Sequence, residues 1–390
     1  MHGHPDVVII GGGVIGSATA YFLRLDGRCR VIVIERDASY ARASSALSAS
    51  SIRQQFSCPV NIALSRFGLE FLRNLEEHLE VDGDAPAIGL REPGYLYLAG
   101  PDGEAVLRAN YATQAAHGVK TALLDPAGLR ARFPWMNVEG LVAGSLGLDG
   151  EGWFDGPALH RAFLRKARSL GAEYRQAEAV GFEREGDAIT AVRLADGERV
   201  PCGAVVNAAG PYARTVASWA GIALPVEARR RSVFVLACRE RLPDCPLVID
   251  TTGVWFRPDG ERFLAGWSPP EQDDPERLAL DVDHEQFDEV VWPAVAARAP
   301  ALEAVRVTGS WAGHYEFNTF DQNALLGRLP EAPNLYFGNG FSGHGMQQSA
   351  GAGRGLSELI LHGRWTTLDL GDLDVGRVPA GRKLRELNII

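Results

Sequence analysis

The sequence predicts an α/β fold of the mixed α+β kind, with a Rossmann-like nucleotide-binding domain and a second domain built on a mixed β-sheet. Three observations support this prediction. Residues 7–35 alternate strand, glycine-rich turn, helix and strand, a second glycine-rich strand-to-helix turn begins at Gly338, and residues 227–317 carry a mostly β pattern. Parallel strands joined through a helix are typical of nucleotide-binding domains, whereas the β-rich middle indicates a separate sheet.

Composition narrows the class of protein. The chain has 390 residues, of which 46% are hydrophobic and 23% charged, with a formal net charge of −10. It is too apolar for a disordered chain, and its acidic balance argues against a nucleic-acid partner. No apolar run is long enough for a membrane span, and the five cysteines lack the spacing of a metal site or a disulfide framework. Residues 1–5 do not resemble a secretory signal, so we expect a cytoplasmic protein.

The first predicted unit consists of a strand at 7–10, a helix at 14–25 and a strand at 30–34. In the connecting Gly-x-Gly-x-x-Gly turn, Gly11 permits a tight bend, Gly13 lets the backbone approach a pyrophosphate, and Gly16 lets helix and strand pack closely. The helix N-terminus offers N–H groups to phosphates. Glu35 ends the second strand, where a carboxylate can accept hydrogen bonds from ribose hydroxyls. The unit therefore predicts a dinucleotide site, without deciding between NAD and FAD.

The later elements are predicted from the spacing of apolar residues and from the residues that typically begin or end helices and strands. Apolar residues at helical spacing, often opened by Ser, Asp or Pro, predict five further helices, at 59–79, 103–117, 155–170, 284–297 and 346–362. Alternating or β-branched runs between turn residues predict strands at 92–99, 179–183, 189–194, 199–202, 204–207 and 334–337, with a hairpin at 258–260.

Two later turns favour a flavin over a nicotinamide. At 205–211 a buried strand runs into a turn of small residues, which is suited to pass beside a ligand. At 338–345 a glycine-dense turn precedes a helix, whose positive end would point at an anionic centre. A reduced isoalloxazine ring carries negative charge near N1 and O2, and a helix N-terminus stabilises such a charge.

Together these segments resemble the FAD-dependent oxidoreductases of the D-amino acid oxidase superfamily, which have a glutathione-reductase-type fold. The branch resembled most contains monomeric sarcosine oxidase, glycine oxidase and dimethylglycine dehydrogenase. The motifs that carry the resemblance are VVIIGGGVIGSATAYFL, VIVIER, ASSALSASSIRQQF, VVNAAGPYA and NLYFGNGFSGHGMQ. Three further segments, SIRQQFSCPVNIALS, WAGHYEFNTFDQNALLG and the terminal ELNII, resemble one mitochondrial member of this family more closely.

The resemblance implies an extended FAD with its adenosine on the first unit. It implies an FAD-binding domain at 1–88, 150–226 and 321–390, and a substrate-binding domain at 89–149 and 227–320. The positions that match the FAD-contacting residues of the family are Gly11, Gly13, Val14, Ile15, Gly16, Glu35, Arg36, Ser44, Ser45, Val180, Ala208, Ala209, Gly210, Gly343, His344, Gly345 and Met346.

The resemblance also predicts that FAD is bound noncovalently. Members with a covalent flavin attach it to a Cys on the strand before the flavin segment, or to a His near the first serine pair. Here residues 311–321 and 44–51 contain no Cys, and His314 is their only His. Ala46 stands where that His is often found.

Four residues are candidates for the reaction itself. Arg53 matches the family's arginine that binds the substrate carboxylate, a task suited to a planar and always charged side chain. Tyr315 matches an aromatic residue over the flavin face and can hydrogen-bond a carboxylate, and His344 can act as a donor near the flavin. Gln347 stands where sarcosine oxidases place a lysine that activates O2, so we expect slow oxidase turnover and an electron acceptor other than O2.

The implied activity is oxidation of an amino acid or N-substituted amino acid, a secondary or tertiary amine. A hydride moves from the carbon next to nitrogen to flavin N5, and the resulting imine hydrolyses. Its partners would be this small substrate and O2 or another electron acceptor. Two alternatives stay open: oxidation of a 2-hydroxy acid or alcohol, which would need a base such as His314 or His344 near the reacting carbon, and a scaffold or assembly role.

Overall fold

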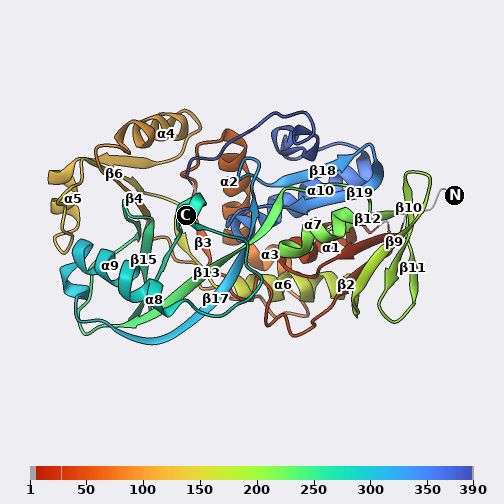
Figure 1. Ribbon diagram of the computed structural model, residues 1–390, viewed down its shortest axis with the longest axis horizontal. Coiled ribbons are helices and arrows are strands. Elements are labelled where there is room, and N and C mark those ends of the chain that lie inside the picture. Colours follow the sequence, from red (N-terminus) through yellow and green to blue (C-terminus); the bar gives the residue numbers. More distant parts are fainter. Residues whose placement is uncertain (1–5, 28, 389–390) are drawn as a thin grey trace.

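The computed structural model describes residues 6–27 and 29–388, in which two β-sheets lie side by side along the long axis of the molecule (Figure 1). One end holds a six-stranded sheet with helices α1 (Val14–Leu25) and α10 (Gly345–His362), and the other holds an eight-stranded sheet with helices at its periphery. The predictions made for residues 1–5, and the last two residues of the ELNII motif, lie outside the described residues.

The six-stranded sheet is built around the predicted first unit. Strand β1 (Val7–Ile10) lies between β2 (Val31–Glu35) and β12 (Ala204–Asn207), with parallel pairing on both sides. The sheet order is β18-β19-β12-β1-β2-β8, in which only β18 pairs antiparallel. The remaining strands are β8 (Glu173–Gln176), β18 (Leu325–Leu329) and β19 (Ala332–Asn339). Their apolar runs are buried, as expected for parallel strands covered on both faces.

Two layers cover this sheet. On one face α1 packs against α10 and α6 (Gly156–Ser169), and α10 packs against α2 (Pro59–Arg73). A short α3 (Leu75–Leu79) follows α2. On the other face lies a three-stranded meander with α7 (Ala213–Ser218). The strands of the meander are β9 (Ala179–Glu185), β10 (Ala188–Leu194) and β11 (Arg199–Pro201).

The eight-stranded sheet has the order β17-β13-β16-β15-β14-β4-β6-β5 and is mixed, because β14 pairs parallel with β4 while the other pairs are antiparallel. Its strands are β4 (Tyr95–Ala99), β5 (Thr121–Leu124), β6 (Ala143–Gly147), β13 (Val226–Ala237), β14 (Leu247–Ile249), β15 (Val254–Asp259), β16 (Arg262–Trp267) and β17 (Arg306–Asn318). Helices around it are α4 (Glu104–Ala116), α5 (Pro126–Arg132), α8 (His284–Gln286) and α9 (Trp292–Arg298). A two-stranded ribbon of β3 (Ser51–Ile52) and β7 (Gly152–Trp153) stands apart from both sheets.

The prediction of a mixed α/β fold is confirmed, and several element boundaries coincide. Strand 7–10 and helix 14–25 lie where they were predicted. The helix predicted at 59–79 is instead two helices separated at Asn74. The helix predicted at 284–297 is interrupted by a π-helical turn at Phe287–Val291. Within the described part of the chain, no helix combines the length and the apolar character that a membrane crossing requires.

Candidate active site

A cavity of about 700 Å³ lies where the two sheets meet, and most predicted site residues line it. The lining includes all four candidates for the reaction, Arg53, Tyr315, His344 and Gln347. Fifteen of the seventeen predicted cofactor residues also line it, namely Gly11, Gly13, Val14, Ile15, Glu35, Arg36, Ser44, Ser45, Ala208, Ala209, Gly210, Gly343, His344, Gly345 and Met346. The chain therefore brings four distant segments to one cavity.

The two predicted cofactor residues outside the lining are Gly16 and Val180. Gly16 serves packing, because a Cβ there would lie 2.0 Å from the carbonyl oxygen of Gly11. Val180 is 42% exposed on β9, and its neighbours Glu178 and Ala179 line the cavity instead. The adenine contact expected of the Val180 backbone stays a prediction.

The first glycine turn has the geometry of a phosphate-binding loop. Gly11 has φ +98°, and a Cβ there would lie 2.3 Å from the carbonyl oxygen of Ala208, so only glycine fits between β1 and β12. Helix α1 begins after Gly13, which supplies no side-chain cap. The amides of Gly13 and Ile15 donate no hydrogen bond to any described residue, and both residues line the cavity. Free N–H groups at a helix N-terminus fit a pyrophosphate.

Glu35 and the serine pair complete this end of the cavity. Oε2 of Glu35 accepts a hydrogen bond from the amide of Gly12 at 2.9 Å, which fixes the carboxylate beside the turn. Oγ of Ser45 accepts from the amide of Val14 at 2.8 Å and so caps α1 from a distant segment. Oγ of Ser44 is buried at the cavity wall and has no partner among the described residues. An orphaned hydroxyl and free helix amides fit the polar groups of FAD.

Three residues at this end, Tyr40, His160 and Tyr212, were not found from the sequence, whereas Arg36 was. The guanidinium of Arg36 stacks over the ring of Tyr212 at 3.8 Å, and both side chains line the cavity. Tyr40 also lines it and packs edge-on against His160, whose Nε2 lies 2.8 Å from the carbonyl oxygen of Gly12. Aromatic residues in loops give no periodic signal, so these contacts emerge only in the folded chain.

The second glycine turn brings the N-terminus of α10 to the opposite end of the cavity. Gly343 has φ +94°, and a Cβ there would lie 2.5 Å from the ring of Tyr315, so the glycine allows the tyrosine to lie over the turn. Burial raises the pKa of Tyr315, while Arg231 and Arg53 lower it. Tyr315 therefore remains a hydroxyl that can donate a hydrogen bond into the cavity.

Arg53 is the most deeply buried cation of the cavity, with 1% of its surface exposed. Nη1 donates to the carbonyl oxygen of Gln55 at 2.7 Å, and Nη2 contacts the carbonyl oxygen of Asn388 and, at 2.9 Å, Nε2 of His344. The ring of Phe56 lies 4.0 Å from the guanidinium carbon. None of these groups is charged, and no carboxylate among residues 6–27 and 29–388 lies within ion-pair distance of Arg53. A buried cation of this kind is suited to bind an anionic ligand.

The arginine fixes the state of His344. Burial and the charge of Arg53 hold the pKa of His344 well below its usual value of 6.5, so the ring is neutral. Because Arg53 only donates hydrogen bonds, Nε2 of His344 accepts, and the proton of the neutral ring lies on Nδ1. The ring nitrogen that faces Arg53 is thus occupied, which makes His344 an orienting group for the arginine and not a free base.

Three further ionisable side chains of the cavity wall were not predicted. Arg231 forms a bidentate ion pair with Asp274 at 2.7 and 2.8 Å, and its guanidinium lies 4.9 Å from the ring of Tyr315. Arg257 donates to the carbonyl oxygen of Ala49 at 2.9 Å. Burial raises the pKa of Glu316 to about 8, and its Oε2 has no partner among the described residues. The described residues contain no cluster of three His, Cys, Asp or Glu side chains placed to hold a metal ion.

Comparison with known proteins places this site in a family. Residues 6–359 match the DAO family, described as FAD dependent oxidoreductase. The chain is 41% identical to FAD-dependent oxidoreductase domain-containing protein 1 of Xenopus laevis, over 99% of the chain and 85% of that protein. It is 28% identical to mitochondrial sarcosine dehydrogenase of Homo sapiens, over 92% of the chain and 40% of that protein. The crystal structure of L-proline dehydrogenase from P. horikoshii superposes with a TM-score of 0.86 at 26% identity, covering 98% of this chain and 100% of the other.

Proposed function

The chain belongs to the DAO family of FAD-dependent oxidoreductases, and from this premise we propose that it oxidises an N-substituted amino acid at the carbon next to nitrogen. Membership makes FAD its cofactor and places it among enzymes of amine and amino acid oxidation. Sarcosine and proline, which appear in the names of two similar proteins, are both secondary amines. These names support an N-substituted substrate for this chain.

The observation that carries the proposal is the buried guanidinium of Arg53 in the cavity wall, which forms no direct ion pair with any described residue. Three of its five N–H donors contact neutral acceptors, and the other two form no hydrogen bond with residues 6–27 or 29–388. A substrate carboxylate at Arg53 would compensate the buried charge, and the hydroxyl of Tyr315 is available as a second donor. The amine would then lie between the carboxylate and the turn at 343–347.

FAD would be held by the turn at 11–13, the Glu35 carboxylate, Ser44, Ser45 and the N-terminus of α10. The chemistry that the bound flavin supplies is acceptance of a hydride at N5, which leaves an imine for hydrolysis. The residues of the chain position the substrate, exclude water and supply charge. No strong base is required when the neutral amine donates the hydride, which agrees with the occupied Nε2 of His344. A 2-hydroxy acid would need such a base, so the amine is favoured.

In this proposal, the neutral side chain of Gln347 indicates which kind of electron acceptor the protein uses. Its amide is neutral, and its oxygen is held by the amide of Arg53 at 2.9 Å and the hydroxyl of Ser65 at 3.2 Å. A cation at this place would favour the reaction of reduced flavin with O2, and the amide supplies none. We therefore propose a dehydrogenase that passes electrons to an acceptor other than O2.

The experiment is an anaerobic screen in which N-methyl, D- and cyclic amino acids are mixed with the FAD-loaded protein. Bleaching of the flavin band at about 450 nm by an N-substituted amino acid supports the proposal. Bleaching only by 2-hydroxy acids, or by no compound of either class, contradicts it. Air is then admitted to the reduced protein, and rapid stoichiometric peroxide formation would contradict the dehydrogenase assignment.

A further inference from the structure

We propose that the segment Glu386–Asn388 forms part of the substrate site, where it orients the guanidinium of Arg53 for a carboxylate ligand. The inference rests on the proposed function, because it assigns positioning residues to the same carboxylate site. The segment belongs to the terminal ELNII motif. The observation that supports this inference is a continuous series of hydrogen bonds that leads from the region of the six-stranded sheet to Arg53.

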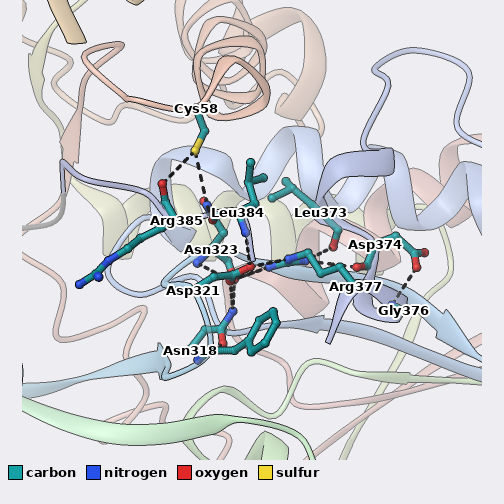
Figure 2. A network of polar contacts seen from close by, with 12 residues as sticks. Cys58, Asn318, Asp321, Asn323, Leu373, Asp374, Gly376, Arg377, Leu384 and Arg385 are labelled. Carbon is teal, nitrogen blue, oxygen red and sulfur yellow. Dashed lines mark hydrogen bonds and ion pairs between the residues drawn. The ribbon is translucent and has the colours of Figure 1, made fainter. Parts of the chain in front are cut away.

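The segment is first anchored to the six-stranded sheet region by a buried ion pair, shown in Figure 2. Arg377 donates to both carboxylate oxygens of Asp321, at 2.7 and 3.0 Å, and both side chains are almost fully buried. Asp321 also accepts the amide of Leu384 at 3.0 Å. The carbonyl oxygen of the next residue, Arg385, lies 3.5 Å from Sγ of Cys58. The chain therefore reaches the start of α2 in a fixed position.

Glu386 then caps α2. Cys58 is the N-cap residue of this helix and forms no side-chain cap. The carboxylate of Glu386, which is fully buried, accepts the amides of Ser57 at 2.7 Å and Cys58 at 3.1 Å, and Nδ2 of Asn61 at 2.9 Å. A carboxylate at a helix N-terminus satisfies free amides and interacts favourably with the helix dipole. The same carboxylate accepts the amide of Asn388 at 3.0 Å, so the cap also sets the path of the last described residues.

Asn388 connects this anchored segment to Arg53. Its carbonyl oxygen accepts from Nη2 of Arg53, and its Nδ2 donates to the carbonyl oxygen of Gln55 at 3.0 Å. That same oxygen of Gln55 accepts from Nη1 of Arg53 at 2.7 Å, so the three residues form a closed ring of hydrogen bonds. Oδ1 of Asn388 is held by Nδ2 of Asn110 at 2.7 Å, which joins the ring to α4.

The consequence is a preorganised arginine. A free arginine side chain loses up to about 2 kcal/mol of conformational entropy when it is ordered. In this fold the ring of hydrogen bonds, together with His344, orders the guanidinium before a ligand arrives. Glu386 and Asn388 act on the ligand through Arg53 in this proposal, so they are positioning residues. Their loss should weaken carboxylate binding and leave the rest of the cofactor cavity in place.

The test uses Asn388→Ala and Glu386→Gln in the full-length, FAD-loaded protein. Asn388→Ala removes the side-chain bonds to Gln55 and Asn110, and Glu386→Gln replaces the capping carboxylate. Glu358→Gln is the matched control, because Glu358 is also fully buried and accepts the amides of Thr366 and Thr367 at 2.7 and 3.0 Å, far along the sequence from Arg53. Propionate is the probe, and its dissociation constant is read from the change it causes in the flavin absorption spectrum.

We expect both tail variants to bind propionate about tenfold more weakly than the wild type, which is the loss expected when one hydrogen bond to a charged group is weakened. For a turned-over substrate, KM should rise by a similar factor while kcat changes little. Glu358→Gln should lower the melting temperature without changing propionate binding. Tail variants that bind propionate as tightly as the wild type, or a wild type that does not bind it, would overturn the inference. If no amine reduces the flavin, only the proposed function fails. The inference on the segment Glu386–Asn388 is still tested, because propionate binding is measured without turnover.

Discussion

Oε1 of Gln347 accepts a hydrogen bond from the backbone amide of Arg53 at 2.9 Å, across 294 residues of sequence. The bond joins the first turn of α10 to the segment that carries Arg53. Because Gln347 also lines the cavity, it couples the position of Arg53 to the N-terminus of α10. The arginine is thus held through its backbone by Gln347 and through its guanidinium by Asn388 and His344.

Gln347→Ala should therefore weaken binding of carboxylate ligands by about five- to tenfold, because a buried amide left without an acceptor costs about 1–3 kcal/mol and its segment shifts to find one. Ligand binding is measured from the flavin spectrum. Gln348→Ala is the control, since Gln348 is buried beside Gln347 and bonds Asn61 at 3.2 Å. Equal losses in both variants would mean that Gln347 acts only through general packing of α10.

The serine pair should separate cofactor binding from stability. Ser45→Ala removes the cap of α1 and should lower the free energy of unfolding of the FAD-free protein by about 1 kcal/mol. Ser44→Ala removes a hydroxyl without a partner among the described residues, so stability should hardly change while FAD binds more weakly. Urea unfolding and FAD titration provide the two measurements. A stability loss for Ser44→Ala equal to that of Ser45→Ala would contradict this assignment.

We predict that FAD can be released without breaking a covalent bond. Among the described residues that line the cavity there is no cysteine, and residues 311–321 of the sequence, where the family resemblance would place one, contain none. Precipitation with trichloroacetic acid should leave the yellow flavin in the supernatant. Colour that stays with the precipitated protein would show a covalent link, and digestion with mass spectrometry would then locate it, with His314 the first candidate.

Glu151 should make stability depend on pH in the neutral range. It accepts the amide of Gln54 and Nε2 of Gln55, both at 2.7 Å, and burial raises its pKa from 4.5 to about 7. The unfolded chain loses this proton near pH 4.5, whereas the folded chain keeps it to about pH 7. The free energy of unfolding therefore falls by about 3 kcal/mol from this group as the pH rises between these values.

The check is the difference in urea stability between the wild type and Glu151→Gln. The variant has no titrating group at this position, so it should gain on the wild type by about 3 kcal/mol between pH 4.5 and pH 7.5. Other titrating carboxyls, Glu316 among them, are common to both proteins and cancel in the difference. A difference that is constant over this range would place the pKa of Glu151 near its ordinary value.

The sequence predicts the elements whose signals are local. Strand 7–10 and helix 14–25 are bounded by a glycine turn and a continuous apolar pattern, and both boundaries are confirmed. Strands β5 and β6 escape the pattern, since β5 is half-buried at the edge of the sheet and β6 contains two glycines among its five residues. The π-helical turn at Phe287–Val291 breaks a helix whose apolar spacing continues across it.

In the candidate site, too, some residues have a local sequence signal and others do not. Glycines and Arg53 stand in motifs that can be read along the chain, and the structure gathers them at one cavity. Two of the groups that hold Arg53, Asn388 and Glu386, are ordinary polar residues in their own segment. Their roles arise from contacts across hundreds of residues, which no local pattern encodes. The domain boundaries and the cellular compartment stay predictions.

The central claim, that Arg53 binds the carboxylate of an N-substituted amino acid, is tested most directly by anaerobic flavin reduction with a matched pair of compounds. An N-methyl amino acid that bleaches the flavin is compared with its carboxamide, which keeps the amine and removes the charge. The wild type should be reduced about 100-fold more efficiently by the acid, and Arg53→Gln should lose most of that preference. Equal reduction by acid and carboxamide, or a preference that survives in Arg53→Gln, would contradict the account.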